Sequence, residues 1–186
     1  MSEHQSHHNR RIRLIYSMKD FQLALSAADF LQECDPDESI NKVQLRRYKC
    51  FETTAIVAYS RPFSESRGSV PRLSMKMIGV RLDEQQQALH DEIIQLRNRV
   101  IAHSDAAMMR MVARIAHVNI GNAERMPYID AVFDEGLSFV GFFRVSQMLA
   151  LFHTVFDGLY TTLLEDVRNN PEGFDISHDY LELDGN

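Results

Sequence analysis

The sequence predicts a mainly all-α fold, a helical bundle of four to five helices with a small β-hairpin inserted around residues 109–133. Two observations carry this prediction. Apolar residues recur at three- and four-residue spacing over long stretches, as they do on the buried faces of amphipathic helices. Short segments rich in proline, glycine, asparagine and acidic residues separate these stretches. With 186 residues, the chain is long enough for one domain with a substantial core.

Residues 1–16 are polar enough to predict a flexible N-terminus. A first helix is expected over residues 17–34, because its apolar residues follow helical spacing and Asp20 stands where a capping box would place it. Proline with flanking acids at residues 35–38 predicts a break, and a second helix is expected over residues 39–59.

Residues 60–82 predict a long connection, since they contain glycine and proline together with five basic residues against one acid. A connection of this length in a compact domain is often functional. Beyond it, a third helix is expected from Asp83 to about Ala102, with a broad stripe of leucine, isoleucine and valine on its buried side.

Residues 105–136 are compatible with helix or strand, and their β-branched residues favour a hairpin weakly. A last helix is expected over residues 137–168, where an Asn-Asn-Pro sequence ends it. Residues 169–186 form an acidic C-terminal tail that we expect to pack only locally. Residues 17–168 are therefore predicted as a single helical domain.

The charge of the chain is unevenly distributed. Residues 39–125 hold fourteen basic and eight acidic residues, a net charge of +6, whereas residues 126–186 hold two basic and eleven acidic residues, a net charge of −9. A basic middle and an acidic tail permit local contact with phosphates without general adhesion to nucleic acid. The simpler interpretation is that these charges lie on the solvated faces of ordinary helices.

The sequence carries no sign of export or of a membrane span. Its first residues are polar and lack the apolar run of a secretory signal, and no stretch approaches the roughly 20 apolar residues of a membrane-spanning helix. Cys34 and Cys50 lack the neighbouring cysteine and histidine spacing of a metal site, so we expect reduced thiols. A cytoplasmic protein with no membrane contact is predicted.

The most specific local pattern is Arg-Asn-Arg-Val-Ile-Ala-His at residues 97–103, at the C-terminal end of the predicted third helix. It resembles the motif of the HEPN superfamily, in which an arginine and a following polar residue precede a histidine by a few positions. Arg97, Asn98 and His103 fit that pattern. The Ser-Arg-Pro-Phe sequence at residues 60–63 is similar to a subgroup of HEPN proteins related to abortive infection. The family fold, a helical bundle with the motif on a late helix, agrees with the predicted elements.

The resemblance implies a metal-independent endoribonuclease in a bacterial defence or toxin–antitoxin context, with Arg97 binding phosphate and His103 as general acid or base. On an ideal helix these two side chains lie about 120° apart around the axis and about 9 Å apart along it. One copy therefore cannot hold one phosphate with both side chains unless the helix unwinds before His103. The resemblance implies that two motif helices pair across a homodimer, with Asn98 orienting the phosphate. Neither cofactor nor metal is implied, because the ribose 2′-OH is the nucleophile.

Other polar residues are candidates for substrate binding. His90 lies seven residues before Arg97 and therefore on nearly the same helix face, and several arginines could extend a phosphate-binding surface. The candidate substrate-binding residues are Arg99, His90, Arg61, Arg46 and Arg47. For each arginine a solvated helix face, and for the histidine a position at the core boundary, is the simpler interpretation.

The predicted partners are a second copy of the chain, RNA and a cognate antitoxin protein. The alternative is a non-catalytic HEPN module that dimerises and binds a nucleotide or a protein. A purely structural interpretation of the motif is also open, in which Arg97 pairs with Glu92 or Asp105 while Asn98 and His103 satisfy the C-terminus of the helix. A third class, an α-helical regulatory protein without enzymatic activity, would equally account for the net negative charge of the chain. At this point both the enzyme and the binding module stay open.

Overall fold

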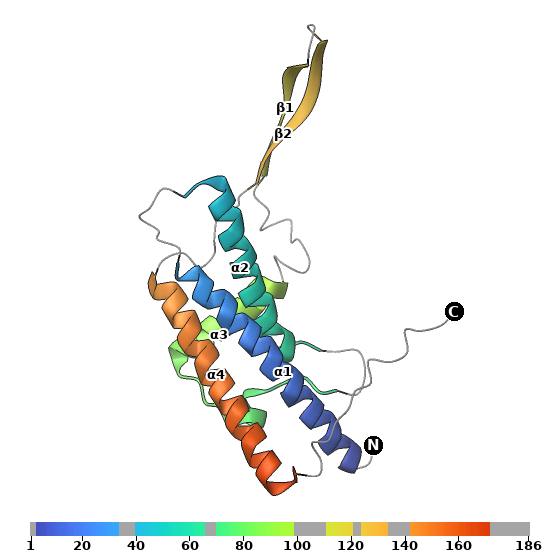
Figure 1. Ribbon diagram of the computed structural model, residues 1–186, viewed down its shortest axis with the longest axis vertical. Helices are drawn as coiled ribbons and strands as arrows, with labels where there is room; N and C mark the ends of the chain where they lie inside the picture. The colour runs from blue at the N-terminus through green and yellow to red at the C-terminus, as the bar shows by residue number, and fades with distance from the viewer. Residues whose placement is uncertain are drawn as a thin grey trace, which may run out of the picture.

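Helices dominate the part of the chain that the computed structural model describes, residues 3–33, 40–65, 70–98, 111–120, 124–133 and 142–171. The α-helices there are α1 (Glu3–Leu31), α2 (Lys42–Ser60), α3 (Glu84–Leu96) and α4 (Phe142–Asn169), joined by short 3-10 helices η1 (Arg61–Phe63) and η2 (Met75–Ile78). Strands β1 (Met111–Ile120) and β2 (Glu124–Phe133) form an antiparallel hairpin. Figure 1 shows this hairpin projecting away from the helices. The predicted helical bundle with a small hairpin is confirmed.

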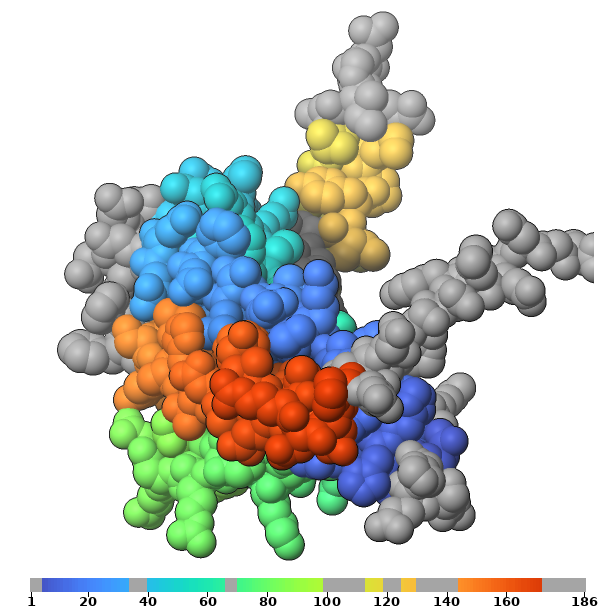
Figure 2. Space-filling model, turned by 60° about the horizontal axis from the view of Figure 1, so that its bottom comes forward, coloured from blue at the N-terminus to red at the C-terminus, as the bar shows by residue number. Residues whose placement is uncertain are grey.

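One apolar core unites the helices. α1 packs against both α2 and α4, and Figure 2 shows α1 and α4 side by side on one face of the molecule. The core draws on all four of these helices and on η2, because each presents apolar residues at helical spacing to its neighbours. Its largest fully buried side chains are Leu14, Phe21, Leu31, Ile56, Tyr59, Ile78, Ile93, Met148, Leu151, Phe152 and Leu159.

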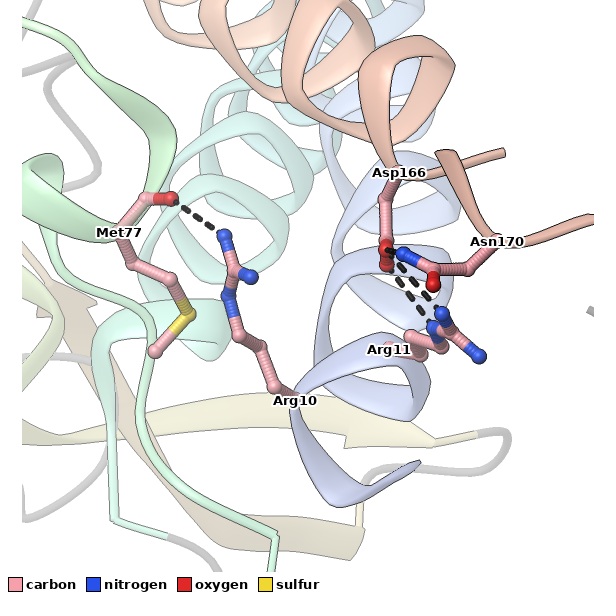
Figure 3. A network of polar contacts seen from close by, with 5 residues as sticks. All are labelled: Arg10, Arg11, Met77, Asp166 and Asn170. Atoms are coloured by element: carbon pink, nitrogen blue, oxygen red, sulfur yellow. Dashed lines mark hydrogen bonds and ion pairs between the residues drawn. The ribbon is translucent and has the colours of Figure 1, made fainter. Parts of the chain in front are cut away.

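The prediction of a flexible N-terminus is wrong for residues 3–16, because α1 begins at Glu3. Arg11 donates two hydrogen bonds to the Asp166 carboxylate of α4, at 2.9 and 3.1 Å, and this network is drawn in Figure 3. The hydrogen bonds from Arg11 hold the pKa of Asp166 below its usual range. Ile12 and Leu14 are buried in the same stretch. Tertiary contacts thus stabilise a first half of α1 whose polar sequence gives little indication of a helix.

Asp20 consequently lies in the middle of α1, so the capping-box interpretation of this residue is wrong. The start of α2 also differs from the prediction. Asn41 caps α2 by accepting from the backbone N–H groups of Val43 and Gln44, at 2.9 and 3.0 Å. The Gln44 side chain accepts in turn from the Asn41 N–H at 3.0 Å and completes a capping box.

The start of α3 agrees with the prediction. Asp83 is its N-cap: its carboxylate accepts from the Gln86 N–H at 2.7 Å, and the Gln86 side chain accepts from the Asp83 N–H at 3.3 Å. The last helix, expected over residues 137–168, is α4 and begins at Phe142. The predicted tail beyond residue 171 lies outside the described residues. Among the described helices, none is long and apolar enough to cross a membrane.

The long connection between α2 and α3 is attached to the bundle where the structure describes it. The Leu73 N–H donates to the Pro62 carbonyl at 2.8 Å, and the side chains of Leu73 and Ile78 are buried in the core. Arg13 Nε of α1 donates to the Pro71 carbonyl at 2.6 Å. At the end of η2 the chain turns through Gly79, whose φ of 66° favours glycine. This segment is therefore part of the packed structure.

Candidate functional site

The motif at residues 97–103 begins where the α-helical geometry of α3 ends. The α-helical part of α3 is described to Leu96, and residues 97–98 form a π-type turn. The rest of the helix expected to about Ala102 lies outside the described residues. The Arg97 N–H donates to the carbonyls of both Ile93 and Ile94. These two bonds are of the α and 3-10 types, so the π-type geometry belongs to residues 97–98 themselves. Turns of the π type occur often at functional sites.

Within this turn the side chains of Arg97 and Asn98 contact each other. Arg97 Nη1 donates to Asn98 Oδ1 at 2.8 Å, so the amide orients the guanidinium. Arg97 is partly exposed and Asn98 is exposed. The third predicted catalytic residue, His103, and the substrate-binding candidate Arg99 lie outside the described residues.

α3 is anchored along its length to its neighbours. Near its start Gln86 Nε2 donates to Thr154 Oγ1 of α4 at 3.1 Å. Near its end Arg144 of α4 forms an ion pair with Glu92 at 2.6 Å. Glu92, considered above as a partner for Arg97, therefore has a partner from α4. These contacts fix the helix that presents the Arg97-Asn98 turn.

His90 anchors α3 to α2 through the aromatic core. Its Nδ1 lies 2.9 Å from the hydroxyl oxygen of Tyr59, a fully buried residue at the end of α2. The His90 ring meets the Phe63 ring edge-on, with centroids 4.8 Å apart, and Tyr59 stacks on Phe152 of α4 at 4.3 Å. The predicted substrate-binding residue thus belongs to a cluster of rings between three helices.

The protonation states in this cluster follow from burial. Burial, and to a lesser degree the charge of Asp91, raise the pKa of Tyr59 far above its ordinary value, so its hydroxyl stays neutral. Burial lowers the pKa of His90, and Asp91 opposes this shift. A neutral phenol beside a neutral imidazole is satisfied when the Tyr59 hydroxyl donates to Nδ1, which leaves the ring proton on Nε2. A direct contact between His90 and a substrate would therefore have to use Nε2.

The lowered pKa of His90 makes stability depend on pH. The unfolded chain, with a histidine pKa of 6.5, takes up the proton first as the pH falls. Above that pH both states hold a neutral His90, and the free energy of unfolding is at its full value. Below it the unfolded chain is stabilised by protonation, so the free energy of unfolding declines until the pH reaches the lower pKa of the folded state. We expect His90→Asn to flatten this decline in urea denaturation between about pH 5 and pH 8, where an unperturbed histidine titrates. His153→Asn, at an exposed position of α4, is the control; an equal flattening in both variants would contradict the assignment.

Arg61 is engaged in an ion pair at the other side of this region. Its Nη1 lies 2.6 Å from Asp20 Oδ1 of α1, with the arginine side chain 55% exposed and the carboxylate largely buried. Burial raises the pKa of Asp20, although Arg61 and Arg13 both act in the opposite direction. The pair ties η1 to α1 and accounts for the position of Arg61 without a ligand.

The two arginines of α2 lie away from the aromatic cluster. Arg46 and Arg47 are both exposed, and the Arg47 guanidinium lies over the Phe51 ring, 5.6 Å from its centroid. Counted in residues, they are about 18–20 Å along the helix axis from Tyr59. The structure therefore does not bring them to His90.

Several buried polar residues were missed or only partly recognised from the sequence. Glu52 of α2 is buried and pairs with Lys49 at 2.7 Å, one turn away. Arg13 and Tyr59 were not recognised as partners of residues far along the chain. The only signal for Tyr59 was its place at the end of an apolar helix face. Its partner, 31 positions later, could not be found from spacing.

Comparison with family models, with curated proteins and with solved structures found no match. In the described ranges, no group of three or more histidine, cysteine, aspartate or glutamate side chains could hold a metal ion. The fold defines the class of protein: a helical bundle with a projecting hairpin. What the site can do chemically is to present an oriented guanidinium at the end of an anchored helix.

Proposed function

We propose that the protein is a metal-independent endoribonuclease of the HEPN type, which works as a homodimer in a bacterial defence or toxin–antitoxin system. The observation that carries this proposal is the Arg97-Asn98 pair in a π-type turn at the end of α3. The helical bundle around it is the fold that the resemblance implies. The contacts of α3 with α2 and α4 support the proposal because a phosphate-binding group needs a rigid base.

Arg97 is the phosphate-binding group in this proposal. A guanidinium presents five N–H donors in a planar fork that suits the oxygens of a phosphate. The hydrogen bond to Asn98 uses one of these donors and restricts the rotation of the side chain. Less conformational freedom is then lost when the phosphate binds.

His103 is the proton-transfer group. It would take the proton from the ribose 2′-OH, whose oxygen attacks the adjacent phosphorus, or deliver a proton to the departing 5′-oxygen. The products would be a 2′,3′-cyclic phosphate and a 5′-hydroxyl. Residues 97–98 depart from α-helical geometry at the start of the motif, a feature that is frequent at functional sites.

The experiment that tests the composite site mixes two inactive variants. Arg97→Ala and His103→Ala are each expected to be inactive on RNA as homodimers. When they are unfolded together and refolded as a mixture, heterodimers hold one intact arginine and one intact histidine in the shared cleft, and cleavage should return in part. A mixture no more active than the single variants would contradict a site shared between two copies.

The second candidate function is a non-catalytic HEPN module that binds a nucleotide or a protein. The observation in its favour is the exposed apolar surface of the β1–β2 hairpin, which a nuclease reaction does not require. Binding of a 2′-deoxy RNA analogue that wild-type protein and His103→Ala hold equally well, with ribose-containing RNA left uncut, would favour this module.

A further inference from the structure

The β1–β2 hairpin is covered on neither face by the helices. Figures 1 and 2 show it standing out from the bundle. On one face the cross-strand neighbours Ile115 and Ile129 are 76% and 75% exposed. On the other face Val118, Met126 and Tyr128 are exposed as well. An isolated two-stranded hairpin is marginally stable in water, so these residues call for a further element that completes the sheet.

The two edges of the hairpin are not equivalent. β2 contains Pro127, opposite His117 of β1. A proline has no N–H, and a sheet tolerates it where its nitrogen points away from the neighbouring strand. The outer edge of β2 therefore lacks a donor near its middle. In an antiparallel pair, opposed residues alternately point their N–H and C=O groups toward each other and toward the outer edges. His117 lies opposite Pro127, so the odd-numbered residues of β1 point these groups to the outer edge, and β1 contains no proline that would remove a donor there.

The β1 edge also lacks the charges that usually prevent edge pairing. Soluble proteins protect such edges with lysine, proline or inward-pointing charges. β1 carries one formally charged side chain, Arg114, and its cross-strand neighbour in β2 is Asp130. The edge is thus ten residues long, largely apolar and compensated in charge within its own hairpin.

We propose that the β1 edge pairs antiparallel with β1 of a second copy of this chain, so that two hairpins form one four-stranded sheet about a twofold axis at Ile115. In this register Ile115 faces its own copy, Ala113 faces His117, and Arg114 faces Ala116. No two like charges stand directly opposite each other, and each Arg114 keeps Asp130 beside it. A second copy fits because one twofold contact pairs the β1 edges of both chains at once.

This contact is separate from the dimer of the proposed function. Antiparallel pairing places the tip of one hairpin beside the base of the other, so the two helical bundles lie at opposite ends of the sheet. The helix-based dimer and the hairpin pairing use different surfaces. Either can therefore fail in experiment without the other.

Cross-linking tests the register. In a background of Cys34→Ser and Cys50→Ser, Ile115→Cys places two cysteines with Cα atoms about 5.5 Å apart, within disulfide reach. Mild oxidation is expected to yield a covalent dimer on non-reducing gels. His117→Cys should not, because its two copies would lie about 13 Å apart along the strands. Ile129→Cys, equally exposed but on the proline-containing strand, is the matched control.

Light scattering tests the contact without cross-linking. Ile115→Lys puts two like charges opposite each other and should reduce the mass of the assembly, whereas Ile129→Lys should leave it at the wild-type value. The helical circular dichroism of both variants is expected to be unchanged, since the hairpin lies outside the helical core. Equal cross-linking at positions 115 and 129, equal loss of mass in both lysine variants, or a wild-type monomer at high micromolar concentration would overturn the proposal.

Discussion

Alanine at Arg97 or His103 is expected to reduce RNA cleavage by at least about a hundredfold in each case. Removal of Arg97 takes away the fork that holds the scissile phosphate, and removal of His103 takes away the group that moves the proton. Initial rates on a fluorescent RNA substrate, at saturating and limiting protein, would measure both losses. Folding should survive in Arg97→Ala, because this side chain is partly exposed and bonds to its exposed neighbour Asn98.

Two variants and three properties of the cleavage reaction control for specificity. Arg46→Ala removes an exposed arginine of α2 far from the aromatic cluster, and Arg99→Ala removes the second arginine of the motif; both are expected to cause a smaller loss, through phosphate affinity alone. Cleavage by the wild-type protein should persist in excess EDTA. Products should carry 2′,3′-cyclic phosphates, and a substrate with 2′-deoxyribose at the cleavage site should resist. Full activity in His103→Ala, or cleavage of the deoxy substrate, would refute the mechanism.

Phe152→Ala is expected to lower the free energy of unfolding by about 3–5 kcal/mol. The Phe152 side chain of α4 is fully buried and stacks on Tyr59, the residue that connects α2 to His90 of α3. Its loss would leave a cavity where three helices meet. Urea denaturation followed by circular dichroism measures the change, with the slope of the transition compared to confirm that the two-state assumption holds.

The matched variant is Tyr160→Ala, which removes an aromatic ring of similar size from the same helix. Tyr160 is 47% exposed, and it stacks on Phe156 outside the cluster around Tyr59. We expect a loss of less than about 1 kcal/mol there. Similar losses at the two positions would show that the Tyr59–Phe152 stack is not the centre of the core.

The helices that carry strong local signals were predictable. The start of α3 at Asp83 was predicted and is confirmed, and the structure adds that Gln86 completes a capping box there. The hairpin could be predicted from its β-branched residues and from the turn-favouring glycine and asparagine between the two strands, because the two strands pair residues that are close in sequence. The start of α2 was predicted at residue 39, two residues before its cap Asn41, because serine and asparagine both favour the cap position and only the geometry distinguishes them.

The sequence by itself determined the class of the fold, the motif at residues 97–103 and its position near the end of a helix. Those features depend on contacts within one or two helical turns, which spacing encodes directly. The tertiary structure alone decided that residues 3–16 are helical, that His90 bonds to Tyr59, and that Arg61 pairs with Asp20. Each of these features depends on residues far apart in the sequence. Tyr59 and His90 are 31 positions apart, and Arg11, which holds the first half of α1 to α4, is 155 positions from its partner Asp166. Such partners meet only when the core brings their helices together, because burial of apolar surface, not local propensity, drives that meeting.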